Sequence, residues 1–241
     1  MTPDTSTSTA HPDDSTTQPG VGAVLFDIDG TLVDSNYLHV HAWAQAFAEA
    51  GLTVDSWRVH RAIGMGSGLL LTDLVGQQDA DRHGEALKDR HGELYTQLAA
   101  QQRAFDGARE LVRAVAERGA RTVLATSAGP TSLEHLREVL DLDDVVTGIT
   151  SAKDVEHAKP SPDLVEAALE IAGVPPERAV MVGDTVWDVE AAARAGVRCV
   201  GVLTGGSSEA ALREAGAVAV YPDVASLLAD LDQSPLASTW R

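Results

Sequence analysis

Short apolar segments rich in β-branched residues recur along the chain, and each is followed by a helical pattern. They are VGAVLFD (21–27), ARTVLATS (120–127), VVTGITS (145–151), RAVMVGD (178–184), RCVGVLT (198–204) and AVAVY (217–221). Strands that alternate with helices predict an α/β fold, with a doubly wound parallel sheet covered by helices on both faces. Because such sheets bind ligands at the carboxyl ends of their strands, we expect functional residues there.

The interval 36–104 departs from this alternation, because it contains amphipathic helical segments and no convincing strand. Helices are predicted over 38–51, 56–64 and 86–102. An all-helical insert after the first strand is expected to lie above the functional edge of the sheet. The chain is therefore divided into an α/β core over 21–35 and 105–231, a helical cap over 36–104, and tails over 1–20 and 232–241.

Glycine stands at the end of the three clearest core helices, which are predicted over 106–119, over 161–173 and up to residue 196. Gly119, Gly173 and Gly196 are expected to adopt the left-handed conformation that closes many helices.

The net charge limits the possible partners. Eighteen Lys and Arg against 36 Asp and Glu leave a formal charge of -18, which opposes non-specific binding to nucleic acid or to an anionic membrane. An anionic substrate must therefore meet a local positive patch or a metal ion. We expect a monomer or a homodimer with no nucleic-acid or membrane partner, and no apolar segment approaches membrane-spanning length.

Cysteine occurs once, as Cys199 inside an apolar segment, so no internal disulfide is possible and the cytoplasm is the expected compartment. Residues 1–20 contain nine Ser or Thr, three Asp and no Lys or Arg. This composition is typical of a disordered tail, and the absence of an apolar stretch disfavours a signal peptide.

Four short motifs fall at or just after the ends of predicted strands: DIDGT (27–31), ATS (125–127), AKPSPD (158–163) and VGDTVWD (182–188). Their order and residue types resemble the haloacid dehalogenase superfamily of phosphatases and phosphotransferases, over roughly residues 22–229. The helical insert resembles the C1 cap of its phosphoglycolate phosphatase and β-phosphoglucomutase-like subgroup.

The resemblance makes Asp27 the nucleophile, which would form an aspartyl phosphate, and Asp29 the general acid and base. Alone, an acid at a strand end is usually solvated or caps a helix, but the whole string DIDGTLVDS favours catalysis. Two neighbouring carboxylates repel each other, so they need a cation between or beside them. Gly30 and Thr31 would shape the turn, and Asp34 is predicted to be structural.

The predicted cofactor is Mg²⁺, because carboxylate oxygens are its preferred protein ligands. By resemblance, the ligands are Asp27, the main-chain carbonyl of Asp29, Asp184 and Asp188, the last either as a direct ligand or as a hydrogen-bond acceptor behind the ligands. Alone, GDxxxD is more often a strand-end cap followed by an exposed acid.

Lys159 and the ATS motif are the predicted phosphate-binding groups. Lys159 precedes Pro160 and by resemblance neutralises the nucleophile and the phosphate, although an isolated Lys is usually solvated. Thr126 and the amide of Ser127 would hold phosphate oxygens where a strand turns into a helix, and a hydroxyl there is otherwise an N-cap.

The cap offers His39, His41, His60, Arg61 and the GMGSG stretch (64–68) as possible contacts to the leaving group. Arg61 and Gly64 are the predicted substrate-binding residues. His39 and His41 do not share a helix face, which disfavours a zinc pair. GMGSG lacks the strand–turn–helix setting of a dinucleotide loop and is predicted to be a cap turn at the active site.

Together these features predict a Mg²⁺-dependent phosphoric monoester hydrolase that acts on a small phosphorylated metabolite. The alternatives are a β-phosphoglucomutase-like phosphotransferase, which would share every core motif, a dehalogenase, which would need neither Asp29 nor a metal, and a non-catalytic binding protein.

Overall fold

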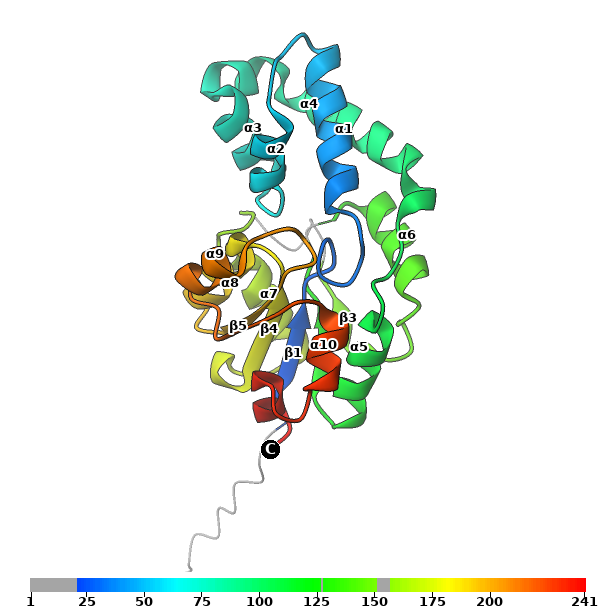
Figure 1. The fold of residues 1–241 in the computed structure, drawn as a ribbon, viewed down its shortest axis with the longest axis vertical. Coiled ribbons are helices and arrows are strands. Elements are labelled where there is room, and N and C mark those ends of the chain that lie inside the picture. The colour runs from blue at the N-terminus through cyan, green and yellow to red at the C-terminus, as the bar shows by residue number, and fades with distance from the viewer. Residues whose placement is uncertain (1–20, 127, 151–156) are drawn as a thin grey trace, which may run out of the picture.

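A six-stranded parallel sheet forms the centre of the molecule (Figure 1). The computed structural model describes residues 21–126, 128–150 and 157–241, so the predicted tail over 1–20 lies outside the described residues. The strands are β1 (Ala23–Phe26), β2 (Arg121–Leu124), β3 (Gly148–Ile149), β4 (Ala179–Gly183), β5 (Arg198–Val202) and β6 (Ala219–Tyr221). Their order is β3-β2-β1-β4-β5-β6, and every neighbouring pair is parallel. The predicted α/β fold with a parallel sheet is confirmed.

Helices cover both faces of the sheet. One face packs α5 (Ala108–Glu117), α6 (Pro130–Leu140) and α10 (Val224–Ala229), and the other packs α7 (Asp163–Ala172), α8 (Val186–Arg194) and α9 (Glu209–Ala215). Along β1, Val24 and Phe26 face the first group, whereas Ala23 and Leu25 face the second. This period of two, with all four residues fully buried, explains why the strand is apolar throughout.

The predicted helix ends at Gly119, Gly173 and Gly196 are confirmed, with φ angles of 87°, 59° and 74°. The short β3 strand occupies only two residues of the predicted segment 145–151, and residues 151–156 are not described.

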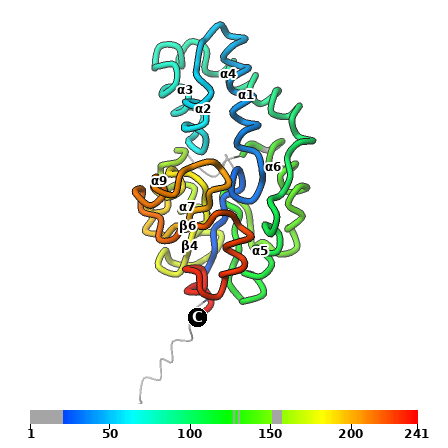
Figure 2. Tube along the Cα trace, viewed as in Figure 1, coloured from blue at the N-terminus to red at the C-terminus, as the bar shows by residue number. Residues whose placement is uncertain are grey.

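A layer of helices lies above the carboxyl edge of the sheet, as the tube in Figure 2 shows. It consists of α1 (Asn36–Glu49), α2 (Ser56–Ala62), α3 (Ser67–Val75), α4 (Gln77–Gln97) and the 3-10 turn η1 (Ala99–Gln101). These helices have their own buried cluster, which includes Trp43, Phe47 and Leu71. The chain returns to the core where Val33 bridges Ala104. Among the described helices, none is both long and apolar enough to cross a membrane.

Part of this layer differs from the helices predicted from the sequence. Helix α3 begins inside the stretch predicted to be a turn, because Leu70, Leu71 and Leu74 form a buried face. Helix α4 begins at Gln77, earlier than predicted, since its first two turns are almost entirely polar and show no apolar period.

The predicted C-terminal tail over 232–241 is also corrected. Its residues form a 3-10 helix, η3 (Pro235–Thr239), that packs on the core through the fully buried side chain of Leu236. Ser234 caps this turn, and the carbonyl of Thr239 accepts a hydrogen bond from the amide of Gly22, 2.9 Å away. The apolar residues of this segment therefore complete the core beside the first strand.

Candidate active site

Asp27 directly follows β1 and is the first side chain past the carboxyl end of the central strand. Its amide donates to the carbonyl of Val182 at 2.9 Å, which continues the sheet ladder through the residue. The chain then turns at Gly30, whose φ is 77°. A Cβ at Gly30 would lie 2.6 Å from Asp184 Oδ2 and closer still to Asn36, so this turn requires glycine.

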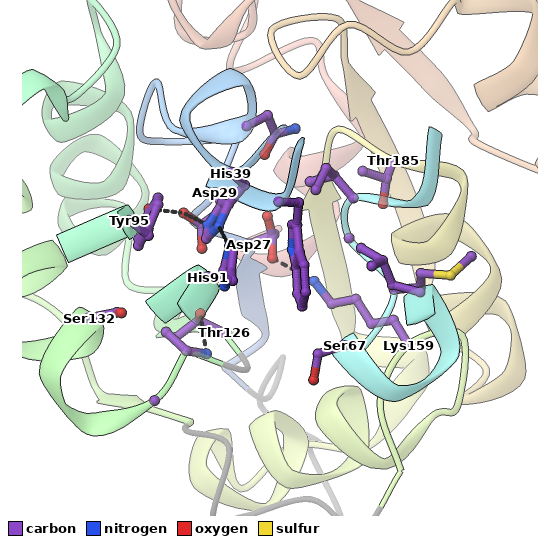
Figure 3. Close-up of a pocket in the computed structure, with 18 of the residues that line it drawn as sticks. Asp27, Asp29, His39, Ser67, His91, Tyr95, Thr126, Ser132, Lys159 and Thr185 are labelled. Carbon is purple, nitrogen blue, oxygen red and sulfur yellow. Dashed lines mark hydrogen bonds and ion pairs between the residues drawn. The ribbon is translucent and has the colours of Figure 1, made fainter. Parts of the chain in front are cut away.

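Three buried carboxylates meet at this edge of the sheet. Each of Asp27, Asp184 and Asp188 offers one oxygen, and these oxygens all lie within 4.8 Å of one another. Lys159 lies among them, with its Nζ 2.5 Å from Asp27 Oδ1 and 2.6 Å from Asp188 Oδ1. Figure 3 shows the Lys159 side chain extending toward Asp27. The structure thus brings together four of the predicted site residues from three separate motifs.

Burial controls the electrostatics of this acid cluster, which we define as Asp27, Asp184, Asp188 and Lys159. It raises the pKa of Asp27 to about 7; the charge of Lys159 opposes this shift and that of Asp188 adds to it. Burial also raises the pKa of Asp184 well above its ordinary value, together with the charges of Asp188 and Asp27. For Lys159, burial alone would lower the pKa, but the charges of Asp188 and Asp27 raise it.

The charges of the acid cluster do not balance. Three carboxylates and one ammonium group, when all are ionised, leave two negative charges in a buried site. A divalent cation with oxygen ligands would neutralise both, and Mg²⁺ prefers carboxylate oxygens. The donor set therefore fits Mg²⁺.

The side chain of Asp184 is oriented from two sides. Its Oδ1 accepts from Thr31 Oγ1 at 3.0 Å, and its Oδ2 accepts from Asn36 Nδ2 at 2.8 Å. The loop at Gly205 approaches so closely that a Cβ there would overlap Asp184 Oδ2. The Thr31 hydroxyl is also 3.3 Å from Asp27 Oδ2, so it contacts both acids. Thr31 was predicted only to shape the turn.

Asp188 has a local structural function as well. Its Oδ2 accepts from the amide and the hydroxyl of Thr185, at 3.0 and 2.6 Å, and its own amide donates to Thr185 Oγ1. This capping box fixes the start of α8. The other oxygen, Oδ1, faces Lys159. Asp188 therefore positions Lys159 and α8 beside the cation site more than it offers a free ligand oxygen.

Asp29 lies apart from the acid cluster, in contact with the helical layer. Its Oδ1 accepts from Ser35 Oγ at 2.6 Å and from Tyr95 Oη at 3.3 Å, and His39 Nε2 is 3.5 Å away (Figure 3). Burial acts to raise the pKa of Asp29, but the contacts with His39, Ser35 and Tyr95 outweigh it, so the pKa is lowered. The surroundings thus favour the ionised form of Asp29 and the protonated form of Asp27.

Stacked rings support Asp29 from the helical layer. His39 stacks on Tyr95 with ring centroids 3.8 Å apart, and His91 stacks on Trp43 at 4.2 Å. His39 Nδ1 and His91 Nε2 lie 3.1 Å apart, which joins the two stacks. Burial, with the charge of His39, lowers the pKa of His91 to about 3, so His91 is uncharged near neutral pH.

The predicted substrate-binding residues separate into two groups. Thr126 is buried and lines the same cavity as Asp27, and its Oγ1 accepts from the amide of Ala128 at 3.0 Å. Gly64 also lines this cavity, whereas Arg61 is exposed and lines a neighbouring pocket beside Trp57 and Trp187. Ser127 lies outside the described residues.

The cavity that joins these groups has a volume of about 310 Å³ and lies between the sheet edge and the helical layer. Its lower wall carries the acid cluster, and its upper wall comes from α1, α3 and α4. Four further residues belong to the site although the sequence did not predict them there: Ser35, Asn36, His91 and Tyr95. Ser35 and Asn36 directly follow the first motif, but His91 and Tyr95 reach it only through the packing of α4.

The fold and the site define a haloacid dehalogenase-like hydrolase, and the chain belongs to this family: the family model matches residues 21–196. The chain is 34% identical over 215 residues to a phosphoglycolate phosphatase of Rhodospirillum rubrum, covering 85% of this chain and 88% of that one. It is 37% identical to a hydrolase from Pseudomonas syringae whose crystal structure superposes with a TM-score of 0.83, covering 88% of this chain and 98% of the other.

A third relative is much longer. Protein SUPPRESSOR OF QUENCHING 1 of Arabidopsis thaliana, a chloroplastic protein, is 32% identical over 212 residues, which are 86% of this chain but only 20% of that protein. The predicted membership of this family, in its phosphoglycolate phosphatase-like subgroup, is confirmed, and the chain is an enzyme of the phosphatase type.

The Ser35 hydroxyl offers a test of how Asp29 is held. We expect Ser35→Ala to lower kcat about ten-fold with little change in KM, because a hydrogen bond to a charged group is lost next to the reacting atoms. Steady-state kinetics on a phosphate monoester measure this. Ser234→Ala is the matched control, since Ser234 is equally buried and bonded to Leu231 but lies in η3; an equal loss of kcat there would contradict a specific effect.

The raised pKa of Asp27 predicts how stability depends on pH without metal. Because the folded pKa exceeds the unfolded value of 3.8, its contribution is fully present below pH 3.8 and is lost as the pH rises through about 7. In EDTA, the Tm is therefore expected to fall between about pH 4 and about pH 7. Saturating Mg²⁺ should remove most of this decline, and parallel curves with and without Mg²⁺ would contradict the prediction.

Proposed function

We propose that this chain is a Mg²⁺-dependent phosphatase that hydrolyses a small phosphorylated metabolite through an aspartyl phosphate on Asp27. The observation that carries the proposal is the buried acid cluster, in which three carboxylates converge at the carboxyl edge of the sheet and two of them contact a single lysine. The phosphatases among its relatives support the same chemistry.

The cation would be held by the carboxylates of Asp27 and Asp184, with the main-chain carbonyl of Asp29 and support from Asp188. When bound, it supplies positive charge against the phosphate oxygens and the nucleophile. Lys159 adds a second positive charge at Asp27. The Thr126 hydroxyl, which lines the cavity, is placed to donate to a phosphate oxygen.

In the first step, an oxygen of Asp27 attacks phosphorus, and the bond from phosphorus to the leaving oxygen breaks. Asp29 gives its proton to that oxygen, so the product leaves as a neutral alcohol. In the free enzyme, contacts with His39, Ser35 and Tyr95 hold the pKa of Asp29 low. A bound dianionic phosphate raises this pKa, so Asp29 is protonated when substrate is present and can donate its proton.

In the second step, ionised Asp29 takes a proton from water, and the water oxygen attacks phosphorus. The bond from phosphorus to Asp27 breaks, inorganic phosphate leaves, and both carboxylates return to their starting states. The contacts that favour the ionised form of Asp29 therefore assist this step.

A β-phosphoglucomutase-like phosphotransferase remains the second candidate, because it uses the same core motifs. The decisive incubation contains β-glucose 1-phosphate with catalytic glucose 1,6-bisphosphate. Net hydrolysis predicts release of free phosphate, whereas rapid formation of glucose 6-phosphate with little free phosphate would establish the mutase. A dehalogenase would need neither Asp29 nor a metal, and a non-catalytic protein would need neither Asp27 nor Asp184.

The direct test is a screen of phosphorylated metabolites for phosphate release, with Mg²⁺ and with EDTA. We expect Mg²⁺-dependent turnover of at least one small monoester, and no turnover across a broad panel would end the proposal. The single cysteine, buried Cys199, favours a reducing compartment and hence the cytoplasm.

A further inference from the structure

Part of the cavity wall that the helical layer forms is apolar. Trp43 of α1, Ile63 directly after α2 and Leu70 of α3 are buried and line it, and Met65 joins them between α2 and α3. Such a wall gains free energy when apolar atoms cover it and loses free energy when a charged group is desolvated against it.

Cations are scarce on this wall. The fully described segment 36–104 contains six Lys and Arg, and of these Lys88 alone lines the cavity. Its ammonium group is already 2.8 Å from Glu85 Oε1 and is partly exposed. Arg61 was the cation of the cap expected at the active site, but Lys88 occupies that position instead. Its pairing with Glu85 leaves it less able to bind a substrate anion.

The other five cations of this segment are directed elsewhere. Arg58 donates to carbonyls at the end of α3, Arg61 lines the neighbouring pocket, and Arg82, Arg90 and Arg103 each pair with a carboxylate outside the cavity.

The remaining charges of the described cavity lining also disfavour a second anion. Lys159 is held between Asp27 and Asp188, and His39, which also lines the cavity, faces the negative charge of Asp29 at 3.5 Å. His91, on the same wall as Trp43, is half-buried and uncharged near neutral pH. The cavity volume of about 310 Å³ is at the lower end of the range for ligand pockets, which is about 300–1,000 Å³.

We infer that the substrate is a compact phosphate monoester whose leaving group is uncharged, turns an apolar face toward Trp43, Ile63 and Leu70, and carries neither a carboxylate nor a second phosphate. This inference rests on the proposed function, since it concerns the leaving group of the same reaction. It assigns specificity to the cap wall and predicts that charge, more than size alone, excludes other monoesters.

Two matched pairs of substrates test the inference on the full-length enzyme with Mg²⁺. They are ethyl phosphate with phosphoglycolate, and benzyl phosphate with 4-carboxybenzyl phosphate; each pair differs chiefly in a carboxylate. We expect kcat/KM to be at least about ten-fold higher for the uncharged leaving group in both pairs. Equal values, or a preference for the carboxylates, would overturn the inference while leaving the phosphatase intact, whereas no hydrolysis of any monoester would overturn both.

A cation introduced by mutation tests whether this wall of the cavity causes the preference for uncharged leaving groups. Ser67 and Leu69 are both exposed on the first turn of α3, but only Ser67 lines the cavity. Ser67→Arg is expected to reduce the preference for uncharged leaving groups by roughly five-fold, because it supplies a partner for the carboxylate. Leu69→Arg, the matched control, should keep the parent preference. The same preference in both variants would overturn the assignment of this wall to the leaving group.

Discussion

Replacement of Asp27 by asparagine is expected to lower kcat by at least about 10⁴-fold while the protein stays folded. The amide nearly matches the carboxylate in shape. Its oxygen can still accept from Lys159, which donates to Asp27 Oδ1 at 2.5 Å, and its NH2 group takes the place of Oδ2, where it can donate to the Thr31 hydroxyl 3.3 Å away. The amide cannot form the acyl phosphate, so the loss should fall on turnover and not on folding.

The measurement is phosphate release under saturating substrate, with near-UV circular dichroism and Tm as tests of folding. Asp34→Asn is the matched control, because Asp34 belongs to the same DIDGTLVDS string but pairs with Arg103 at the surface. Near-normal turnover in folded Asp27→Asn, or an equal loss in Asp34→Asn, would end the assignment of the nucleophile.

Removal of the cation should have the second largest effect. We expect EDTA to lower the rate about 10³-fold or more, with recovery on addition of Mg²⁺, and Asp184→Asn to lose a similar amount. Asp184 is fully buried and, unlike Asp27 and Asp188, does not contact Lys159. Its negative charge therefore has no cationic side chain beside it, which favours a metal ligand.

Stability separates this function from a structural one. In EDTA, Asp184→Asn should be at least as stable as the parent, because burial and the neighbouring acids destabilise its charge. With Mg²⁺, only the parent should gain Tm. An unchanged rate in EDTA, or an equal Mg²⁺-induced shift in the variant, would contradict the metal site. Asp188→Ala should lower the rate less than Asp184→Asn, and because Asp188 contacts Lys159 and Thr185 it should also lower Tm.

The sheet was predictable because each strand is encoded locally. Strands β1 and β4 are buried on both faces, so their residues are apolar without interruption, and the glycines after α5, α7 and α8 mark the helix ends. Helix α4 was only half predicted, because its buried residues are few and its first turns are polar. The packing of η3 was not predicted, because Leu236 is a single apolar residue in a short segment and becomes part of the core only through its contact with the first strand.

The acid cluster was predictable for a related reason. Parallel strands end at one edge, so acids that follow β1 and β4 must converge there, and Asp27 and Asp184 do so. The partners of Asp29 were not predictable, because Tyr95 lies 66 positions away on α4 and meets it only through packing between helices. Likewise, the position of Arg61 outside the main cavity depends on how α2 is rotated, which its sequence does not specify.

The stereochemical course at phosphorus tests the covalent mechanism most directly. A phosphorothioate monoester, made chiral at phosphorus by its sulfur and two oxygen isotopes, is hydrolysed in water that carries a third oxygen isotope. The configuration of the inorganic thiophosphate product is then determined. Attack by Asp27 followed by attack of water gives two inversions and therefore predicts net retention. Net inversion would show a single direct attack by water and would contradict the aspartyl phosphate on Asp27.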